Sequence, residues 1–157
     1  MKRLGMDPGD IHVGWAYHIG LVNLEYAITG EWRPMEACRK VKEMILGGKI
    51  DEIVMEEHRL YDKNYENQAW SPFKTVQLIG AIKWIAQDYA PERSWKCPVH
   101  GEGPGIHVHE QGATIKKGTR AQLKARGIRQ VGHGTHALDA ELHVWHRYLR
   151  EFEAGRG

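Results

Sequence analysis

The sequence contains little cysteine and lacks a long apolar run. Its 157 residues include only two cysteines, Cys38 and Cys97, and the chain has no signal-like start. Both observations argue against a disulfide framework and favour a reducing compartment, so we expect a cytoplasmic protein. No apolar run approaches the ~18 residues of a membrane span, and therefore no segment is expected to cross a membrane.

Charge of one sign is not in large excess either. The 22 Lys and Arg residues only slightly outnumber the 20 Asp and Glu residues, so composition argues weakly for a polyanionic partner. The length suits one domain with its own core, which we expect at residues 1–153, with a flexible tail at 154–157. The basic residues are unevenly placed, because one short stretch holds Lys116, Lys117, Arg120, Lys124, Arg126 and Arg129. This stretch is either a solvated helix face or a surface that contacts phosphates.

Hydrophobic alternation predicts a three-stranded antiparallel meander at the start of the chain. A short apolar stretch leads to Asp7, and residues 13–19 then alternate with the two-residue period of a strand. Residues 22–28 repeat the alternation, with a tight hairpin expected at Gly20 and a strand end at Gly30.

The next segments predict a helix, a strand and a loop. Pro34 and the apolar residues that follow it at helical spacing indicate a helix that ends at 47–48. The β-branched run at 50–55 is typical of a buried strand, and Glu56 follows it directly. Residues 58–71 are polar and irregular, which predicts a mobile loop.

Residues 72–89 predict a long helix that is apolar on two sides. One stripe contains Leu78, Ile79, Ile82, Ile85 and Tyr89, and the other contains Phe73, Val76 and Trp84. Such a helix needs two partners, and we expect the sheet to be one and a second subunit to be the other.

The remainder of the chain predicts a loop, an edge strand and two helices. Residues 90–105 are rich in proline and glycine and indicate a loop, whereas 106–110 alternate as an edge strand does. Thr119 can cap a short third helix, and Thr135 can cap the last one. The buried stripe of the last helix is expected to contain Leu138, Leu142, Trp145, Leu149 and Phe152, with His136, Asp139, His143 and His146 on a neighbouring face.

Four residues from three distant segments form the candidate site. These residues are Asp7, Glu56, His136 and Asp139. Each has a simpler interpretation: Asp7 before Pro8 can form a turn, Glu56 can be an exposed strand-end residue with Glu57 as a competitor, and the helix can present a solvated polar face. Gathered carboxylates repel one another unless a divalent cation compensates, and oxygen-rich ligands select Mg²⁺ or Mn²⁺. Two such ions ~3.5–4 Å apart are used to attack a phosphodiester with water.

Four segments resemble the successive motifs of the RuvC-type Holliday junction resolvases, within the ribonuclease-H-like superfamily. They are residues 7–9, 13–16, 53–56 and 136–140, and the His and Asp three residues apart in the last one are the most specific part. The resemblance implies an α/β fold with a five-stranded mixed sheet in the order 3-2-1-4-5, flanked by helices. It also implies a homodimer that nicks four-way DNA junctions with Mg²⁺ or Mn²⁺, two ions per site, and no small-molecule cofactor. Asp7, Glu56, His136 and Asp139 would then be the metal-binding and catalytic residues.

The chain departs from this family in two places. An aromatic residue that the family often has three places after the strand glutamate is replaced by Arg59, so Tyr61 or Tyr65 would have to supply an aromatic surface to the junction. A window with Cys97, His100, His107 and His109 offers zinc ligands, although the last two residues can equally flank the solvent side of a strand. The short chain is compatible with a phage-encoded member of the family, in the cytoplasm of a bacterial cell or phage-infected host.

We assign the remaining DNA contacts to the basic stretch. Lys116, Lys117, Arg120 and Lys124, together with Arg59 and Tyr61, are expected to bind DNA, and Lys117 is expected to assist catalysis, with Lys116 as the alternative. Three other functions stay open: a nuclease of this fold that acts on other branched DNA, one that acts on RNA-containing substrates, and a non-catalytic DNA-binding module. A sugar kinase or chaperone ATPase is a poor fit, because residues 10–12 lack a Ser or Thr and the chain lacks a second domain.

Overall fold

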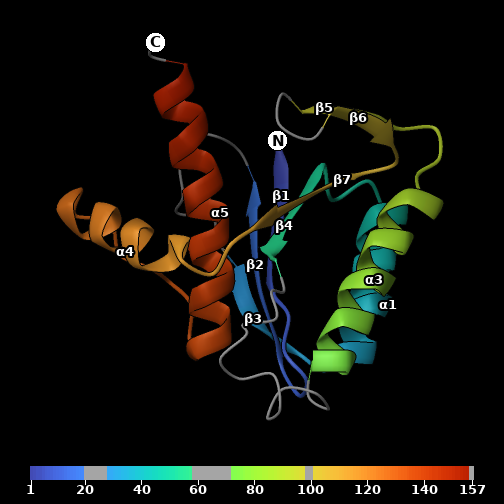
Figure 1. Ribbon diagram of the computed structural model, residues 1–157, viewed down its shortest axis with the longest axis horizontal. Helices are drawn as coiled ribbons and strands as arrows, with labels where there is room; N and C mark the ends of the chain where they lie inside the picture. Colours follow the sequence, from blue (N-terminus) through green and yellow to red (C-terminus); the bar gives the residue numbers. More distant parts are fainter. Residues whose placement is uncertain (20–27, 58–71, 98–100, 156–157) are drawn as a thin grey trace.

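The computed structural model describes residues 1–19, 28–57, 72–97 and 101–155 (Figure 1). Its main sheet has five strands in the order β3-β2-β1-β4-β7. The strands are β1 (Lys2–Asp7), β2 (Val13–Ile19), β3 (Ile28–Trp32), β4 (Glu52–Glu56) and β7 (His107–Gln111). β1 is antiparallel to β2 and parallel to β4, and β7 is parallel to β4 at the edge of the sheet. This order confirms the predicted 3-2-1-4-5 arrangement, because β7 is the fifth strand of the main sheet.

Helices cover both faces of this sheet. α1 (Pro34–Leu46) and α3 (Pro72–Asp88) pack together on one face, while α5 (Thr135–Ala154) crosses the other face and α4 (Ile115–Ala125) packs outside it (Figure 1). The larger core lies between the sheet and the α1–α3 pair, and a smaller one lies between α4 and α5. Within the described ranges, no helix combines the length and the apolar character that a membrane crossing requires.

Two glycines allow α5 to lie directly on the sheet. A Cβ added to Gly5 would collide with the carbonyl oxygen of Ala140, and one added to Gly14 would collide with the backbone of His136. Since β1 and β2 have no side chain at these points, the first turns of α5 approach the strands closely. The close packing brings His136 and Asp139 to the end of β1.

Two predictions about strands and loops are wrong. Gly30 does not end a strand but lies in the middle of β3, where a Cβ would come 2.9 Å from the Trp15 ring; part of the predicted strand at 22–28 lies outside the described residues. Residues 90–105 do not form a simple loop, because β5 (Ser94–Cys97) and β6 (Gly101–Pro104) pair as a small antiparallel sheet.

The predicted helix caps also differ from the structure. α4 begins at Ile115, so Thr119 lies inside the helix, buried, with its hydroxyl 3.2 Å from Nδ1 of His146. α5 has Gly134 at its cap position, and Thr135 is already helical. The predicted stripe of α5 is buried at Leu142, Trp145 and Leu149, as its helical spacing requires, while Phe152 at its end is 37% exposed.

Candidate active site

The ends of two adjacent parallel strands define the candidate site. Asp7 is the last residue of β1 and Glu56 is the last residue of β4. Because parallel strands end at the same edge of a sheet, their carboxylates lie together. α5 adds His136 and Asp139 from its first turns, so all four predicted residues come from elements that meet at this edge.

One lysine connects the three carboxylates. Nζ of Lys116, from the start of α4, lies 2.5 Å from Oε2 of Glu56, 2.8 Å from Oδ2 of Asp139 and 3.3 Å from Oδ1 of Asp7. The other Asp7 oxygen lies 2.6 Å from Nδ1 of His136. Asp7, Glu56 and Asp139 are called the carboxylate cluster below. The structure therefore brings the predicted quartet together and adds Lys116 at its centre.

The carboxylates of the cluster differ in proton affinity. Burial raises the pKa of Asp7, and the neighbouring Glu56 carboxylate raises this pKa further. His136 and Lys116 lower the pKa but offset the rise only in part. Burial alone would also raise the pKa of Glu56, but the Lys116 ammonium beside it outweighs burial, and the pKa of Glu56 is about 2. Burial opposes the charged form of Lys116, yet its carboxylate partners raise its pKa. The cluster thus concentrates negative charge at Glu56 and a fixed positive charge at Lys116.

Of the two neighbouring lysines at the start of α4, Lys116 faces the carboxylate cluster, whereas the catalytic role was predicted for Lys117. The Lys116 side chain is 20% exposed and faces the carboxylates. Lys117 is exposed. The difference follows from the helix start: because α4 begins at Ile115, consecutive residues on it point about 100° apart, and only one of two neighbouring lysines can face the sheet edge.

His143 was expected only as a neighbour of the predicted ligands. It lies one turn after Asp139 on α5 and its side chain is fully buried. Its Nε2 atom lies 3.5 Å from Oε2 of Glu56. Ligand atoms of Asp7, Glu56 and His143 all lie within 4.8 Å of one another, which is close enough for them to share a cation. The three carboxylates at this edge are oxygen donors suited to Mg²⁺ or Mn²⁺, and two imidazoles lie beside them.

A second group, Glu52, His107 and His109, also lies within 4.8 Å but fits a cation poorly. Glu52 already accepts hydrogen bonds from Arg3, at 2.7 Å, and from Arg147, at 3.2 Å. The two guanidinium groups already compensate the charge of the Glu52 carboxylate, and they would repel a divalent ion.

The predicted zinc window bears on this second group. His107 is buried and its ring stacks on Trp95 at 4.4 Å, so it does not flank the wet side of its strand. His100 lies outside the described residues. Among the side chains that the structure describes, the predicted zinc window contributes His107 and His109, which lie beside a carboxylate that two arginines already neutralise.

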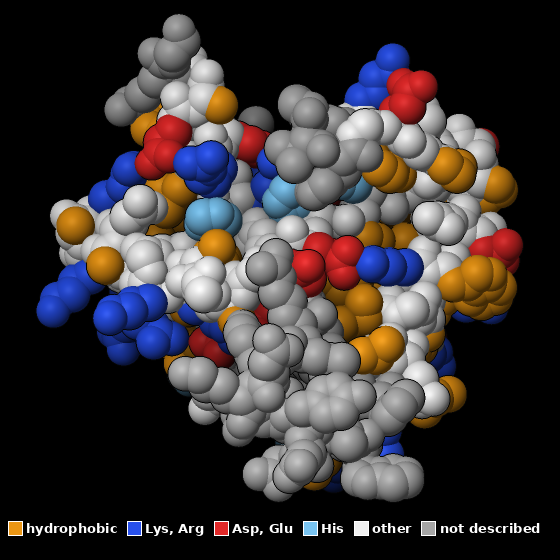
Figure 2. Space-filling view, viewed as in Figure 1, with side chains coloured by type: hydrophobic (Ala, Val, Ile, Leu, Met, Phe, Trp, Pro, Cys, Tyr) orange, Lys and Arg blue, Asp and Glu red, His pale blue; other side chains and the backbone are white. Residues whose placement is uncertain are grey.

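A basic surface continues from the carboxylate cluster over α4. It consists of Lys117, Arg120 and Lys124, which follow one another at helical spacing. A pocket lined by these residues also contains Lys116 and Asp139, so the surface reaches the cluster directly. Figure 2 shows Lys and Arg side chains gathered on the side of the molecule that α4 forms.

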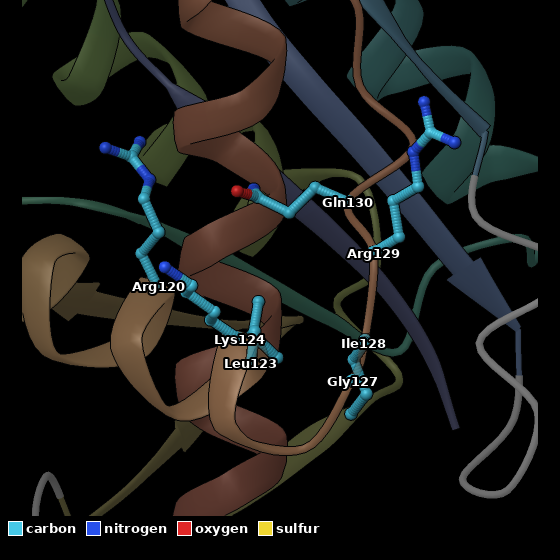
Figure 3. A pocket seen from close by; sticks show the side chains of 7 residues that line it. All are labelled: Arg120, Leu123, Lys124, Gly127, Ile128, Arg129 and Gln130. Atoms are coloured by element: carbon cyan, nitrogen blue, oxygen red, sulfur yellow. The ribbon is translucent and has the colours of Figure 1, made fainter.

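A second pocket lies on the other side of Arg120 and Lys124. Its wall is completed by Leu123 and by residues 127–130, which connect α4 to α5 (Figure 3). In this connection Gln130 donates a 3.0 Å hydrogen bond to the Leu138 carbonyl, which fixes the segment against α5. Cationic side chains thus line both flanks of α4. Arg59, Tyr61 and Tyr65, the other predicted DNA contacts, lie outside the described residues.

Comparison with known proteins identifies the fold. No protein-family model matches the sequence, and no curated protein matches it significantly. Among solved structures, T. thermophilus RuvC in complex with Holliday junction substrate aligns with a TM-score of 0.59 at 16% identity, over 97% of this chain and 96% of that chain. A second Thermus thermophilus RuvC structure aligns with a TM-score of 0.59 at 14% identity, over 98% and 97% of the two chains.

The chain therefore has a RuvC-like fold. This agrees with the fold that the four sequence motifs implied, and the similarity extends over nearly the whole of both chains. At 14–16% identity the similarity establishes the architecture. The chemistry that a shared fold supports depends on the residues of the site.

Proposed function

We propose that the protein is a metal-dependent endonuclease that cleaves four-way DNA junctions by paired phosphodiester hydrolysis. One observation carries the proposal: on a RuvC-like fold, Asp7, Glu56, His136 and Asp139 meet at the end of the central strands, beside a basic helix. A junction substrate is consistent with the RuvC neighbour that was solved with Holliday junction DNA. Such a substrate would place the protein in the cytoplasm of a bacterial cell.

The carboxylate cluster and His136 are the proposed metal-binding residues, with two Mg²⁺ or Mn²⁺ ions per site. When bound, these ions would activate water for in-line attack and stabilise the charge of the departing oxygen. The cluster is suited to holding them because Glu56, with a pKa of about 2, is ionised throughout the physiological pH range. His136 contacts Asp7 at 2.6 Å and orients that carboxylate.

Lys116 is the proposed electrostatic catalyst. Without ions its ammonium compensates the three carboxylates, at 2.5 to 3.3 Å. In the reaction it would place a positive charge beside the reacting phosphate, where negative charge develops. We assign this role, which was predicted for Lys117, to Lys116 because its side chain faces the carboxylates.

The basic surface of Lys117, Arg120 and Lys124 is the proposed path of the DNA backbone. Its side chains continue the line from Lys116 along α4 and are mostly exposed; the Arg120 side chain is 58% exposed, although one guanidinium nitrogen lies 3.4 Å from Asp139. Exposed cations of this kind bind phosphates without reading sequence. They would hold a junction arm next to the carboxylate cluster.

Paired nicks require two active sites, and we propose a homodimer formed through α3. Its buried stripe faces the core, but Val76 and Trp84 on its other side are 47% and 55% exposed. An isologous contact between two copies of α3 would cover these side chains. Assembly of this kind would fix the separation of the two carboxylate clusters.

Cleavage assays with defined substrates test the proposed function. Purified protein with Mg²⁺ should nick a four-way junction at symmetric positions, and should cut linear duplex, a flap and an RNA/DNA hybrid at much lower rates. Asp139→Asn, purified in parallel, controls for contaminating nucleases. Preferential cutting of the hybrid would instead indicate an RNA-directed nuclease. Junction binding with no cutting in the presence of Mg²⁺ or of Mn²⁺ would indicate a non-catalytic DNA-binding module.

A further inference from the structure

His143 has a buried ring nitrogen directed at the carboxylate cluster. The side chain is fully buried, between α5 and the sheet. Its two nitrogens face different partners: Nδ1 lies 3.0 Å from Oε1 of Gln111, and Nε2 lies 3.5 Å from Oε2 of Glu56. Gln111 and Glu56 are register partners on β7 and β4, so the two strands hold both contacts in place.

The contact with Gln111 decides which nitrogen carries the proton. An amide oxygen can only accept, so Nδ1 of His143 is the donor in this arrangement. In the neutral imidazole, Nε2 then has a lone pair, and within the part of the chain that the structure describes it has no hydrogen-bond partner. A lone pair that faces a carboxylate oxygen is repulsive unless a cation lies between them.

The distance between His143 and Glu56 distinguishes a shared cation from a hydrogen bond. A charge-assisted N–H···O bond is ~2.7–2.9 Å long, whereas the observed separation is 3.5 Å. Two ligand atoms that bind one ion at ~2.1 Å are themselves roughly 3–4 Å apart. The separation thus suits two ligands of one ion, and Asp7 supplies a third ligand atom within 4.8 Å.

From this geometry we infer that His143 is a direct metal ligand through Nε2, and that Gln111 is a positioning residue that holds it in the required tautomer. The inference rests on the proposed function, because it adds a ligand to the metal site of that nuclease. It goes beyond the predicted quartet, which used only His136 and Asp139 from α5. In metal sites, a ligating histidine usually donates the N–H of its other ring nitrogen to an acceptor, which fixes the tautomer and the orientation of the ring.

An added imidazole has a consequence for metal preference. Mg²⁺ favours oxygen ligands, while Mn²⁺ accepts nitrogen more readily. The site should therefore prefer Mn²⁺ over Mg²⁺, and this preference in affinity should be larger than that of a site made of carboxylates alone. This selectivity can be measured without DNA or cleavage.

Mn²⁺ titration followed by electron paramagnetic resonance tests the ligand role. His143→Gln should raise the Kd for Mn²⁺ about 10- to 100-fold, and pulsed measurements should lose a ¹⁴N coupling that His136→Gln retains. His146→Gln is the matched control, because His146 is on the same helix but contacts Thr119 instead of the cluster. An unchanged Kd and ¹⁴N spectrum in His143→Gln would overturn the inference.

Two substitutions of Gln111 test the positioning role while keeping His143. Gln111→Glu retains an acceptor for Nδ1, and Gln111→Met removes it at similar size. The charge that Gln111→Glu adds changes the affinities for both ions alike. The readout is therefore the Kd for Mg²⁺ divided by the Kd for Mn²⁺. The ratio should fall in Gln111→Met and stay at the wild-type value in Gln111→Glu. An unchanged ratio in Gln111→Met would refute the role of Gln111, and this pair also carries the test if His143→Gln does not fold.

The same titration separates this inference from the proposed function. Wild-type protein that binds neither ion at millimolar concentrations would contradict the metal-dependent nuclease itself. Wild-type protein that binds Mn²⁺ with the same affinity and spectrum as His143→Gln would leave the nuclease intact and remove only His143 from its ligands.

Discussion

The ammonium nitrogen of Lys116 lies 2.5 Å from the Glu56 carboxylate, and this contact joins the first turn of α4 to the end of β4. The same nitrogen reaches the other two members of the carboxylate cluster. Three carboxylates this close would otherwise repel one another. The lysine therefore stabilises the metal-free protein at the site where the proposed ions would bind.

Lys116→Met should separate catalysis from binding. Because the ammonium would stabilise charge on the reacting phosphate, the single-turnover rate on bound junction should fall about 10²- to 10³-fold. Junction affinity should change far less. Lys117→Met is the matched control, since its exposed side chain should affect affinity alone. A wild-type rate at saturating Lys116→Met protein would remove the lysine from the mechanism.

The same variant should be less stable without metal. Removing Lys116 leaves the carboxylate cluster without its cation, so the melting temperature in EDTA should drop below that of the wild type. Mg²⁺ or Mn²⁺ should restore much of the difference, because an ion that binds the folded state stabilises it. Melting curves with and without metal measure this directly.

Asp7→Asn should abolish cleavage and leave junction binding intact or tighter. Asp7 would hold the ions, so its loss removes the reaction, while one negative charge fewer reduces repulsion of phosphate. Single-turnover cleavage and a binding titration on the same preparation give both quantities. Cutting at the wild-type rate with Mg²⁺ would mean that the active site lies elsewhere.

Local patterns in the sequence indicate most of the strands and helices, whereas the order of the sheet and the roles of the quartet were implied by the resemblance of four motifs to the RuvC-type resolvases. Alternation marks the first strands, and the His and Asp three residues apart on one helix face identify the last motif. Lys116 could not be chosen over Lys117, since that choice depends on where α4 begins, and the N-cap residue Thr114 makes no side-chain capping hydrogen bond. His143 was seen on the correct helix face, but its pairing with Gln111 depends on the register of β7 against β4.

Tertiary contacts also explain the missed elements. Glycine is a residue type that often ends a strand, yet Gly30 lies within β3 because the Trp15 ring occupies the space that a side chain would fill. Similarly, the prolines and glycines at 90–105 suggest a loop, but Gly103 leaves room for the Trp95 ring across β5 and β6. Packing of a distant tryptophan is not visible in a local pattern.

Lys124→Ala should weaken junction binding without slowing the reaction on bound DNA. An exposed lysine that contacts one phosphate releases about one counterion, so the slope of log K against log salt should fall by about one unit. Lys40→Ala on α1, on the opposite face of the sheet, is the control for a general loss of charge. Equal salt slopes for both variants and the wild type would exclude Lys124 from the DNA path.

Stability should depend on pH through His18. Burial, and to a smaller extent Arg3, lower the pKa of this histidine from 6.5 to about 4. The unfolded chain therefore binds the proton more tightly, so stability is complete above pH 6.5 and is lost as the pH falls toward 4. The loss between pH 7 and pH 5 should be about 2 kcal/mol. Urea denaturation of wild type and His18→Leu measures it, and an equal pH dependence in both proteins would contradict this assignment.

Trp84→Glu should convert a dimer to a monomer. Trp84 is 55% exposed on α3, away from the core stripe, so an acidic side chain there should not disturb folding but should oppose a contact between two copies of the helix. The control is Phe152→Glu, an equal change of charge at a partly exposed position of α5 on the other face of the sheet. Light scattering at micromolar concentrations should give a dimeric mass for the wild type and the control. A monomeric wild type in low salt would contradict the proposed dimer. It would also remove the explanation of paired nicks, since each molecule would then bring a single carboxylate cluster to the junction.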